Sequence, residues 1–241
     1  YHDRLWEAET EEGALGTVIS FSLFSPDGDQ GYPGNANITV SYTLTPDDSL
    51  VIAYHMVSDS DTVANFTNHS YFNLDGQDSG NAMSQRVWID ADTYTAADAG
   101  SIPTGEIVPV AGTPMDFTAM KVIGRDIEEE YEALILGEGY DHNWILNHAP
   151  GETELSAAAE SDKTGIRMEV YTDLPGMQFY TGNFLGAGPA GKNGMVYAPR
   201  YGYCFETQYY PNAVNMPEFP SPVLKAGEEY RTTTIYRFTR W

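Results

Sequence analysis

Short stretches of alternating apolar and polar residues, rich in β-branched and aromatic side chains, recur along the chain. This alternation predicts strands at residues 37–44, 50–57, 86–90, 165–171, 177–181, 203–207 and 230–238. Turn sequences separate them, such as SPDG at 25–28 and NHAPG at 147–151, whose prolines and glycines supply the backbone angles of tight connections. Many short strands joined by such turns indicate an all-β sandwich or barrel rather than alternating strands and helices.

One segment departs from the strand pattern. Residues 127–136 carry three glutamates early, at 128–130, and the apolar residues Ala133, Leu134 and Leu136 late. Acidic side chains near the start and apolar ones further on are typical of a short helix, which Gly137 would end. We therefore expect one or two short helices in an otherwise β-rich chain.

The length and organisation of the chain favour a single domain. A chain of 241 residues can bury a sizeable core, and β-sandwiches of this size commonly form one domain. No internal repeat, low-complexity tract or linker marks a second domain, so we expect one domain over residues 1–241. No run approaches the roughly eighteen apolar residues of a membrane helix, so we expect no membrane partner.

Charge and cysteine content narrow the range of partners. With 12 basic and 35 acidic side chains, the net charge of −23 repels phosphate backbones and argues against a nucleic-acid partner. The same charge weakly disfavours phosphorylated ligands, although it also has a simpler reading as an aid to solubility. Cys204 is the only cysteine, so the chain forms no internal disulfide, and we expect a buried, inert thiol and a cytoplasmic location.

Four segments carry a resemblance to a known family. They are NFTNHSYFNLDG at 65–76, GYDHNWIL at 139–146, TDLPGMQFYTGNFL at 172–185, and the thirty-four residues 205–238 that begin FETQ. Together, and in this order, they resemble the aldose 1-epimerase, or galactose mutarotase, family. The resemblance implies a large, twisted antiparallel β-sandwich that interconverts the α- and β-anomers of a neutral hexose such as galactose or glucose.

This reaction sets the chemistry that the site needs. Opening a hemiacetal requires one group to take the proton from the C1 hydroxyl and another to give a proton to the ring oxygen. A carboxylate, with an ordinary pKa of about 4.3, and an imidazole, with one of about 6.5, suit these two tasks near neutral pH. No metal or redox cofactor is required, and the five histidines and one cysteine show no spacing typical of a zinc site.

The resemblance implies that His69 is the acid and Glu206 the base. Without it, His69 would be a structural histidine of a loop, and Glu206 an ordinary carboxylate facing solvent. The neighbouring aromatic residues Phe205, Tyr209 and Tyr210 would raise the pKa of Glu206 by partial desolvation.

The resemblance also implies three residues that bind the sugar. Asp141 would accept hydrogen bonds from hydroxyls, with a turn cap as its alternative role. Gln178 offers both a donor and an acceptor, whereas strict strand alternation turns Phe179 to the opposite face. Tyr71 either donates a hydrogen bond at the site or packs in the core, and we expect His142 to be structural.

Part of the family pattern is absent from these 241 residues. The family carries, upstream of a segment similar to residues 3–9, a sheet region with a sugar-binding arginine and a second active-site histidine. His2 lacks the two glycines that follow that histidine, so we do not give it this role. We therefore expect an N-terminal segment of the same protein as a partner. Two alternatives stay open: a carbohydrate-binding domain without activity, and a hexose 6-phosphate 1-epimerase, which would need a basic cluster.

Overall fold

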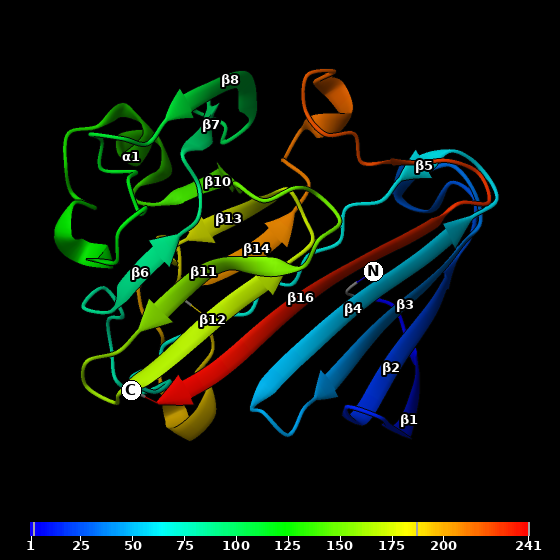
Figure 1. Cartoon of the computed structure of the whole chain (residues 1–241), viewed down its shortest axis with the longest axis horizontal. Coiled ribbons are helices and arrows are strands. Elements are labelled where there is room, and N and C mark those ends of the chain that lie inside the picture. Colours follow the sequence, from blue (N-terminus) through cyan, green and yellow to red (C-terminus); the bar gives the residue numbers. More distant parts are fainter. Residues whose placement is uncertain (2, 187, 241) are drawn as a thin grey trace.

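The computed structural model describes residues 1, 3–186 and 188–240, so His2 lies outside the described residues. Antiparallel strands dominate, in one nine-stranded sheet, one five-stranded sheet and a short pair (Figure 1). In spatial order the large sheet contains β1 (Glu7–Gly13), β2 (Gly16–Ser25), β3 (Ala36–Leu44), β4 (Ser49–Ser58), β16 (Glu229–Arg240), β12 (Ile166–Thr172), β11 (Glu154–Glu160), β6 (Arg86–Ile89) and β9 (Lys121–Val122).

The smaller sheets complete the architecture. The five-stranded sheet runs β14 (Cys204–Gln208), β13 (Gly176–Tyr180), β10 (Asp141–Ile145), β7 (Thr93–Ala97) and β8 (Pro103–Pro109), and the short pair joins β5 (Thr62–Val63) to β15 (Val223–Leu224). Each of the seven predicted strands is present, with ends that differ by at most two residues. The prediction of an antiparallel β-sandwich is therefore confirmed.

The predicted helix is displaced toward its C-terminal end. The α-helix α1 spans Glu132–Gly137, and residues 127–130 form turns and bends instead. Tyr131 precedes the helix in an extended conformation, so the helix begins only at Glu132. The Tyr131 hydroxyl lies 3.0 Å from that of Tyr94. Glu138, rather than Gly137, takes the left-handed conformation that ends the helix, at φ 52°.

The described residues also include four 3-10 turns. The turns are η1 (Asp29–Gly31), η2 (Ile123–Arg125), η3 (Lys192–Gly194) and η4 (Ala213–Asn215). Within the described part of the chain, no helix has both the length and the apolar character to span a membrane.

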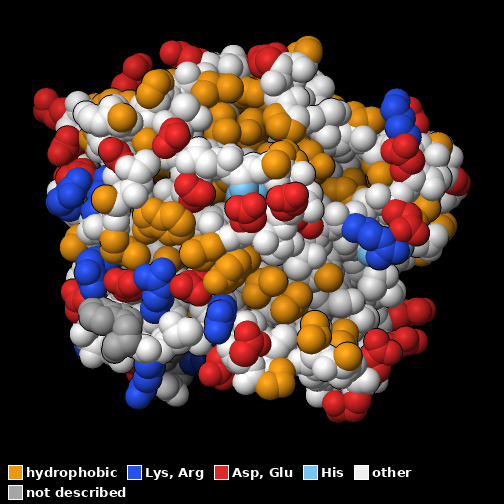
Figure 2. Space-filling view, in the orientation of Figure 1, with side chains coloured by type: hydrophobic (Ala, Val, Ile, Leu, Met, Phe, Trp, Pro, Cys, Tyr) orange, Lys and Arg blue, Asp and Glu red, His pale blue; other side chains and the backbone are white. Residues whose placement is uncertain are grey.

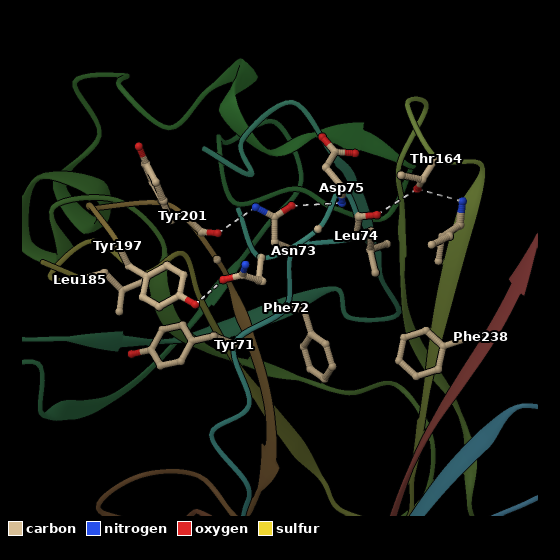
Figure 3. Close-up of a pocket in the computed structure, with 14 residues that line it drawn as sticks. Tyr71, Phe72, Asn73, Leu74, Asp75, Thr164, Leu185, Tyr197, Tyr201 and Phe238 are labelled. Carbon is tan, nitrogen blue, oxygen red and sulfur yellow. Dashed lines mark hydrogen bonds between the residues drawn. The ribbon is translucent and has the colours of Figure 1, made fainter. Parts of the chain in front are cut away.

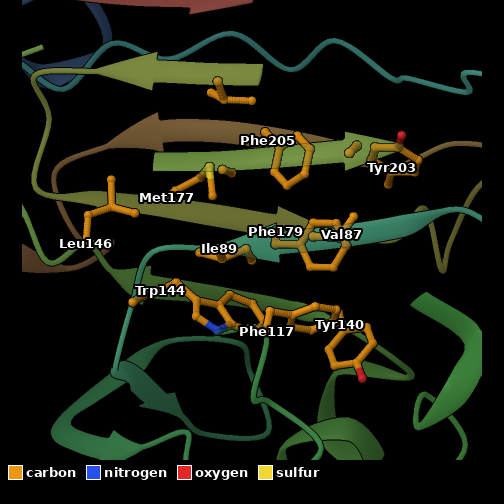
Figure 4. Close-up of a cluster of buried hydrophobic side chains, with 14 of the residues drawn as sticks. Val87, Ile89, Phe117, Tyr140, Trp144, Leu146, Met177, Phe179, Tyr203 and Phe205 are labelled. Atoms are coloured by element: carbon orange, nitrogen blue, oxygen red, sulfur yellow. The ribbon is translucent and has the colours of Figure 1, made fainter. Parts of the chain in front are cut away.

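The hydrophobic core fills the space between the two large sheets (Figure 4). Trp144 of β10, Phe179 of β13 and Phe205 of β14 point into it, and the rings of Phe179 and Phe205 stack at 5.2 Å. Val87 and Ile89 of β6 meet them from the large sheet. Because side chains alternate along a strand, the residues between these core positions point to the outer face of the five-stranded sheet.

Candidate active site

The outer face of the five-stranded sheet carries three of the predicted site residues. Asp141 begins β10, and Gln178 of β13 lies directly opposite Glu206 of β14 in the antiparallel register. The Gln178 amide Nε2 donates a hydrogen bond of 2.7 Å to Asp141 Oδ1. Asp141 is therefore tied to its neighbour across the sheet, and the alternative role as a turn cap finds no support among the described hydrogen bonds.

The loop that carries His69 is fixed in place by its asparagines. The Asn65 amide pairs with both backbone groups of Tyr209, accepting from the nitrogen at 2.9 Å and donating to the oxygen at 3.0 Å. Asn68 Nδ2 donates to the Tyr236 hydroxyl at 3.0 Å, which in turn donates to the backbone oxygen of Phe205 at 2.7 Å. These asparagines account for much of the motif NFTNHSYFN, because they hold the loop against β14.

A backbone bridge just after His69 completes this support. Phe72 and Tyr203 form an isolated antiparallel bridge, with N to O distances of 2.8 and 3.0 Å. Tyr203 immediately precedes β14, so the bridge brings His69 over the strand that carries Glu206. His69 Nε2 lies 3.4 Å from Glu206 Oε1, and the side chains are 50% and 12% exposed.

All five predicted residues line one cavity of about 340 Å³. Its lining consists of His69, Tyr71, Asp141, Gln178, Tyr180, Phe184, Glu206, Gln208 and Pro211. These residues come from the loop after β5, from the strands β10, β13 and β14, and from the segments that follow β13 and β14. The fold thus brings together residues that are up to 142 positions apart in the sequence, from His69 to Pro211.

Burial changes the pKa of the Glu206 carboxylate. Desolvation, reinforced by the negative charge of Asp141, raises the pKa of Glu206 to about 7. Desolvation, the predicted cause, is therefore present, but Phe205 and Tyr210 do not form the predicted aromatic wall. Phe205 points to the opposite face of the sheet, where it stacks on Phe179, and Tyr210 packs against Phe219 at 5.2 Å.

Asp141 and His142 are adjacent on β10, but their side chains point to opposite faces of the sheet. Burial raises the pKa of Asp141, and this effect is opposed by the hydrogen bond from Gln178 and by the charge of His69. His142 points the other way, into the core, with 4% of its surface exposed, and its ring lies edge-on to Trp144. Desolvation lowers the pKa of His142 to about 4, so it remains neutral at physiological pH. It is a core residue, as predicted.

Aromatic side chains form one wall of the cavity. Tyr71 is 46% exposed, so its alternative role as a core residue is wrong, and its ring lies 5.0 Å from that of His69. Tyr180 and Phe184, which the sequence analysis missed, stack at 6.4 Å beside it. Strand alternation from Gln178 predicts the position of Tyr180 two residues later. Phe184 has no such signal, because it lies in the segment after β13.

Tyr71 also lines a second cavity, of about 670 Å³ (Figure 3). Its polar groups are largely engaged with one another: the Tyr197 hydroxyl donates to Gln77 at 2.6 Å, and Asn73 donates to the backbone oxygen of Tyr201 at 2.9 Å. The described residues that line it include no histidine and a single carboxylate, that of Asp75. The smaller cavity, which pairs an imidazole with carboxylates, is therefore the candidate active site.

Three potential metal ligands occur together in this site. Atoms of His69, Cys204 and Glu206 lie within 4.8 Å of one another. The thiol, however, contacts Nδ1 of the imidazole at 3.3 Å, whereas the carboxylate contacts Nε2. Because the two ring nitrogens point in different directions, the three groups form a chain through the imidazole rather than converging on one ion. We do not assign a metal to them.

The family model and the curated relatives that match this chain agree on one family. A family model described as aldose 1-epimerase matches residues 1–237. The chain is 44% identical over 225 residues to a galactose mutarotase from Sus scrofa, a match that covers 93% of this chain and 64% of the relative. It is 38% identical to an aldose 1-epimerase from Escherichia coli (strain K12), covering 91% of this chain and 63% of the relative. The chain thus spans less than two thirds of the length of these two curated relatives.

Solved structures agree with the sequence matches. A galactose 1-epimerase from Lactobacillus acidophilus NCFM superposes with a TM-score of 0.86 at 28% identity, covering 98% of this chain and 67% of that one. An aldose epimerase homologue from C. elegans gives a TM-score of 0.85 at 28% identity, covering 98% of this chain and 69% of that one.

Proposed function

The chain belongs to the aldose 1-epimerase family, and we propose that it interconverts the α- and β-anomers of a neutral hexose, galactose or glucose. The observation that carries this proposal is the contact of 3.4 Å between His69 Nε2 and Glu206 Oε1 within one cavity. The ring oxygen and the C1 hydroxyl of an aldose are bonded to the same carbon. A proton donor and a proton acceptor for these two oxygens must therefore lie side by side, as these two groups do.

In the proposed reaction, Glu206 takes the proton from the C1 hydroxyl while His69 gives a proton to the ring oxygen. The ring opens to the aldehyde, and rotation about the C1–C2 bond presents the other face of the carbonyl group. Ring closure reverses both proton transfers and gives the other anomer. A carboxylate whose pKa is raised to about 7 is a stronger base than an ordinary glutamate and is about half ionised near neutral pH.

We propose that Asp141, Gln178 and Tyr71 hold the sugar. Gln178 Nε2 is engaged by Asp141, whereas its Oε1 is buried and has no hydrogen-bond partner among the described residues. A buried acceptor without a partner is costly, and a sugar hydroxyl would satisfy it. Asp141 offers a charged acceptor to vicinal hydroxyls, and Tyr71 offers a hydroxyl and a ring at the edge of the cavity.

Charge supports a neutral sugar rather than a hexose 6-phosphate. The described residues that line the cavity include two carboxylates and no lysine or arginine. Acidic side chains are spread over the face in Figure 2, whereas most of its lysines and arginines gather toward the lower left. A phosphate group would meet repulsion at the cavity without a cation to bind it. The same charge argues against nucleic acid as a partner.

We also propose that an N-terminal segment of the same protein adds an arginine and a second histidine to the cavity. The family resemblance and the length of the relatives, of which the chain covers 64%, support this. A cytoplasmic location fits the single cysteine and the metabolic role of the family.

Polarimetry of freshly dissolved α-D-galactose tests the proposed function. The protein should accelerate the change in optical rotation beyond a buffer blank at equal pH, and α-D-glucose 6-phosphate should compete poorly. Acceleration by these 241 residues would make the additional segment dispensable. Sugar binding without acceleration, detected by calorimetry, would replace the proposal with a carbohydrate-binding domain or an enzyme that needs the additional segment.

The first prediction concerns pH. Because Glu206 acts only when ionised and its pKa is raised to about 7, kcat/KM should rise between about pH 5 and pH 8. Initial rates by polarimetry, corrected for buffer catalysis at each pH, measure this. A profile that is flat over this range would contradict the assignment of Glu206 as the base.

The second prediction concerns Asp141→Asn. Loss of the charged acceptor should lower kcat/KM about ten- to a hundred-fold, with changes in both KM and kcat, because hydroxyl contacts also position C1. The negative charge of Asp141 contributes to the raised pKa of Glu206, so the rise in rate should also move to lower pH. An unshifted pH profile would mean that the two carboxylates do not interact. The exposed Glu11→Gln, on β1, is the matched control.

A further inference from the structure

The imidazole of His69 lies between a thiol and a carboxylate of the same strand. Cys204 and Glu206 are two residues apart on β14, so both side chains point to the outer face of the sheet, beneath the loop that carries His69. The Cys204 Sγ lies 3.3 Å from Nδ1, and Glu206 Oε1 lies 3.4 Å from Nε2. Each ring nitrogen therefore has its own partner. Cys204 is the one described residue that bonds Nδ1.

The direction of the thiol hydrogen bond follows from the surroundings of Cys204. The residue is completely buried, and burial together with the charges of Glu206 and Asp141 raises the pKa of its thiol. The thiol therefore stays protonated at neutral pH, and its S–H is available to donate to Nδ1. A neutral imidazole that accepts a hydrogen bond at Nδ1 carries its single proton on Nε2.

We propose that Cys204 is a positioning residue that holds His69 in the tautomer whose proton sits on Nε2, the nitrogen that faces Glu206. In terms of the proposed function, on which this inference rests for its catalytic meaning, Nε2 is the nitrogen whose N–H faces the sugar ring oxygen. The thiol also fixes the orientation of a ring that is half exposed and belongs to a loop. Partners on the second nitrogen commonly fix histidine tautomers in this way.

Cys204→Ala and Cys204→Ser form the matched pair that tests the inference. Both side chains fit the space of cysteine, but only serine keeps a donor for Nδ1. In the protein labelled with ¹⁵N-histidine, at about pH 8, where imidazole is ordinarily neutral, the His69 signals are assigned by their loss in His69→Ala. Wild type and Cys204→Ser should show an unprotonated Nδ1 and a protonated Nε2. In Cys204→Ala the Nδ1 signal should move toward that of a free nitrogen, and the Nδ1–H tautomer should increase.

Turnover gives a second readout. Cys204→Ala should lower kcat roughly three- to ten-fold, the effect of one hydrogen bond, with little change in KM, and Cys204→Ser should recover most of the loss. In a His69→Ala background, Cys204→Ala should have no further effect, because the thiol acts through the imidazole. Equal thermal unfolding of the two variants excludes a loss of folding as the cause.

Two results would overturn the inference. One is a wild-type His69 with its proton on Nδ1, which would make the thiol an acceptor. The other is a Cys204→Ala protein with unchanged histidine signals. Neither measurement requires turnover, so the absence of epimerase activity would refute the proposed function and leave the tautomer to be decided by the spectra alone.

Discussion

Glu206→Gln is expected to reduce turnover about a hundred-fold or more while KM changes little. The substitution preserves the size of the side chain but removes the group that takes the proton from the C1 hydroxyl, and loss of a proton-transfer group usually has this effect. Polarimetry with α-D-galactose measures it. The rise in rate between about pH 5 and pH 8 should disappear with the carboxylate, because the pKa near 7 belongs to Glu206. Near-wild-type turnover would remove Glu206 from the mechanism.

The same substitution should make the folded protein more stable at high pH. The pKa of Glu206 is raised in the folded state from 4.5 to about 7, so its favourable contribution is full below about pH 4.5 and is lost as the pH rises through 7. Glutamine never ionises, so the variant should gain on the order of 2 kcal/mol over wild type at about pH 8 and little at about pH 5. Urea unfolding at the two pH values measures the difference.

An exposed carboxylate provides the control for both effects. Glu11 lies on β1, whose residues are all exposed, and it does not line the cavity. Glu11→Gln should therefore leave turnover, its pH dependence and the free energy of unfolding close to wild type. A gain in stability accompanied by a loss of rate, found in Glu206→Gln alone, is what is expected of a charge that is buried for function rather than for folding.

Local pattern predicted seven of the sixteen strands in the described residues, and the residues of some of the others contradict it. β1 has the sequence EAETEEG and is exposed along its whole length, so it offers no alternation of apolar and polar positions. β11 has three successive alanines, Ala157 to Ala159, each fully buried between β12 and β6. Alanine has a weak preference for strands, and burial on both faces of the sheet is what determines its conformation here.

Five residues that line the candidate site were named from the sequence, but the contacts between them were not. Strand alternation places Gln178 away from Phe179, and Cys204 beside Glu206. Nothing local, however, indicates that a thiol 135 positions away contacts His69, because the bridge between Phe72 and Tyr203 creates that proximity. The groups that surround Glu206 were misjudged for the same reason, although its raised pKa and desolvation as the main cause were predicted. Its sequence neighbour Phe205 faces the core, whereas Asp141 approaches from another strand.

His69→Ala is expected to reduce turnover by a similar factor, about a hundred-fold, because the ring oxygen loses its proton donor. His69 is half exposed, so the free energy of unfolding should change little. His55→Ala, on β4 and outside the cavity, is the matched control and should behave like wild type. Added imidazole should restore part of the rate to His69→Ala and none to Glu206→Gln.

The pH dependence of the slow His69→Ala variant separates the two proposed roles. Glu206 remains in place as the base, so the residual rate should still rise between about pH 5 and pH 8, whereas the residual rate of Glu206→Gln should not. If both variants instead lost the rise, Glu206 and His69 would titrate as one coupled unit, and an assignment of acid and base to separate side chains would be wrong. If imidazole restored both variants equally, the rescue would be ordinary buffer catalysis. Only recovery confined to His69→Ala, with the pH rise intact, assigns the proton on Nε2 to the ring oxygen.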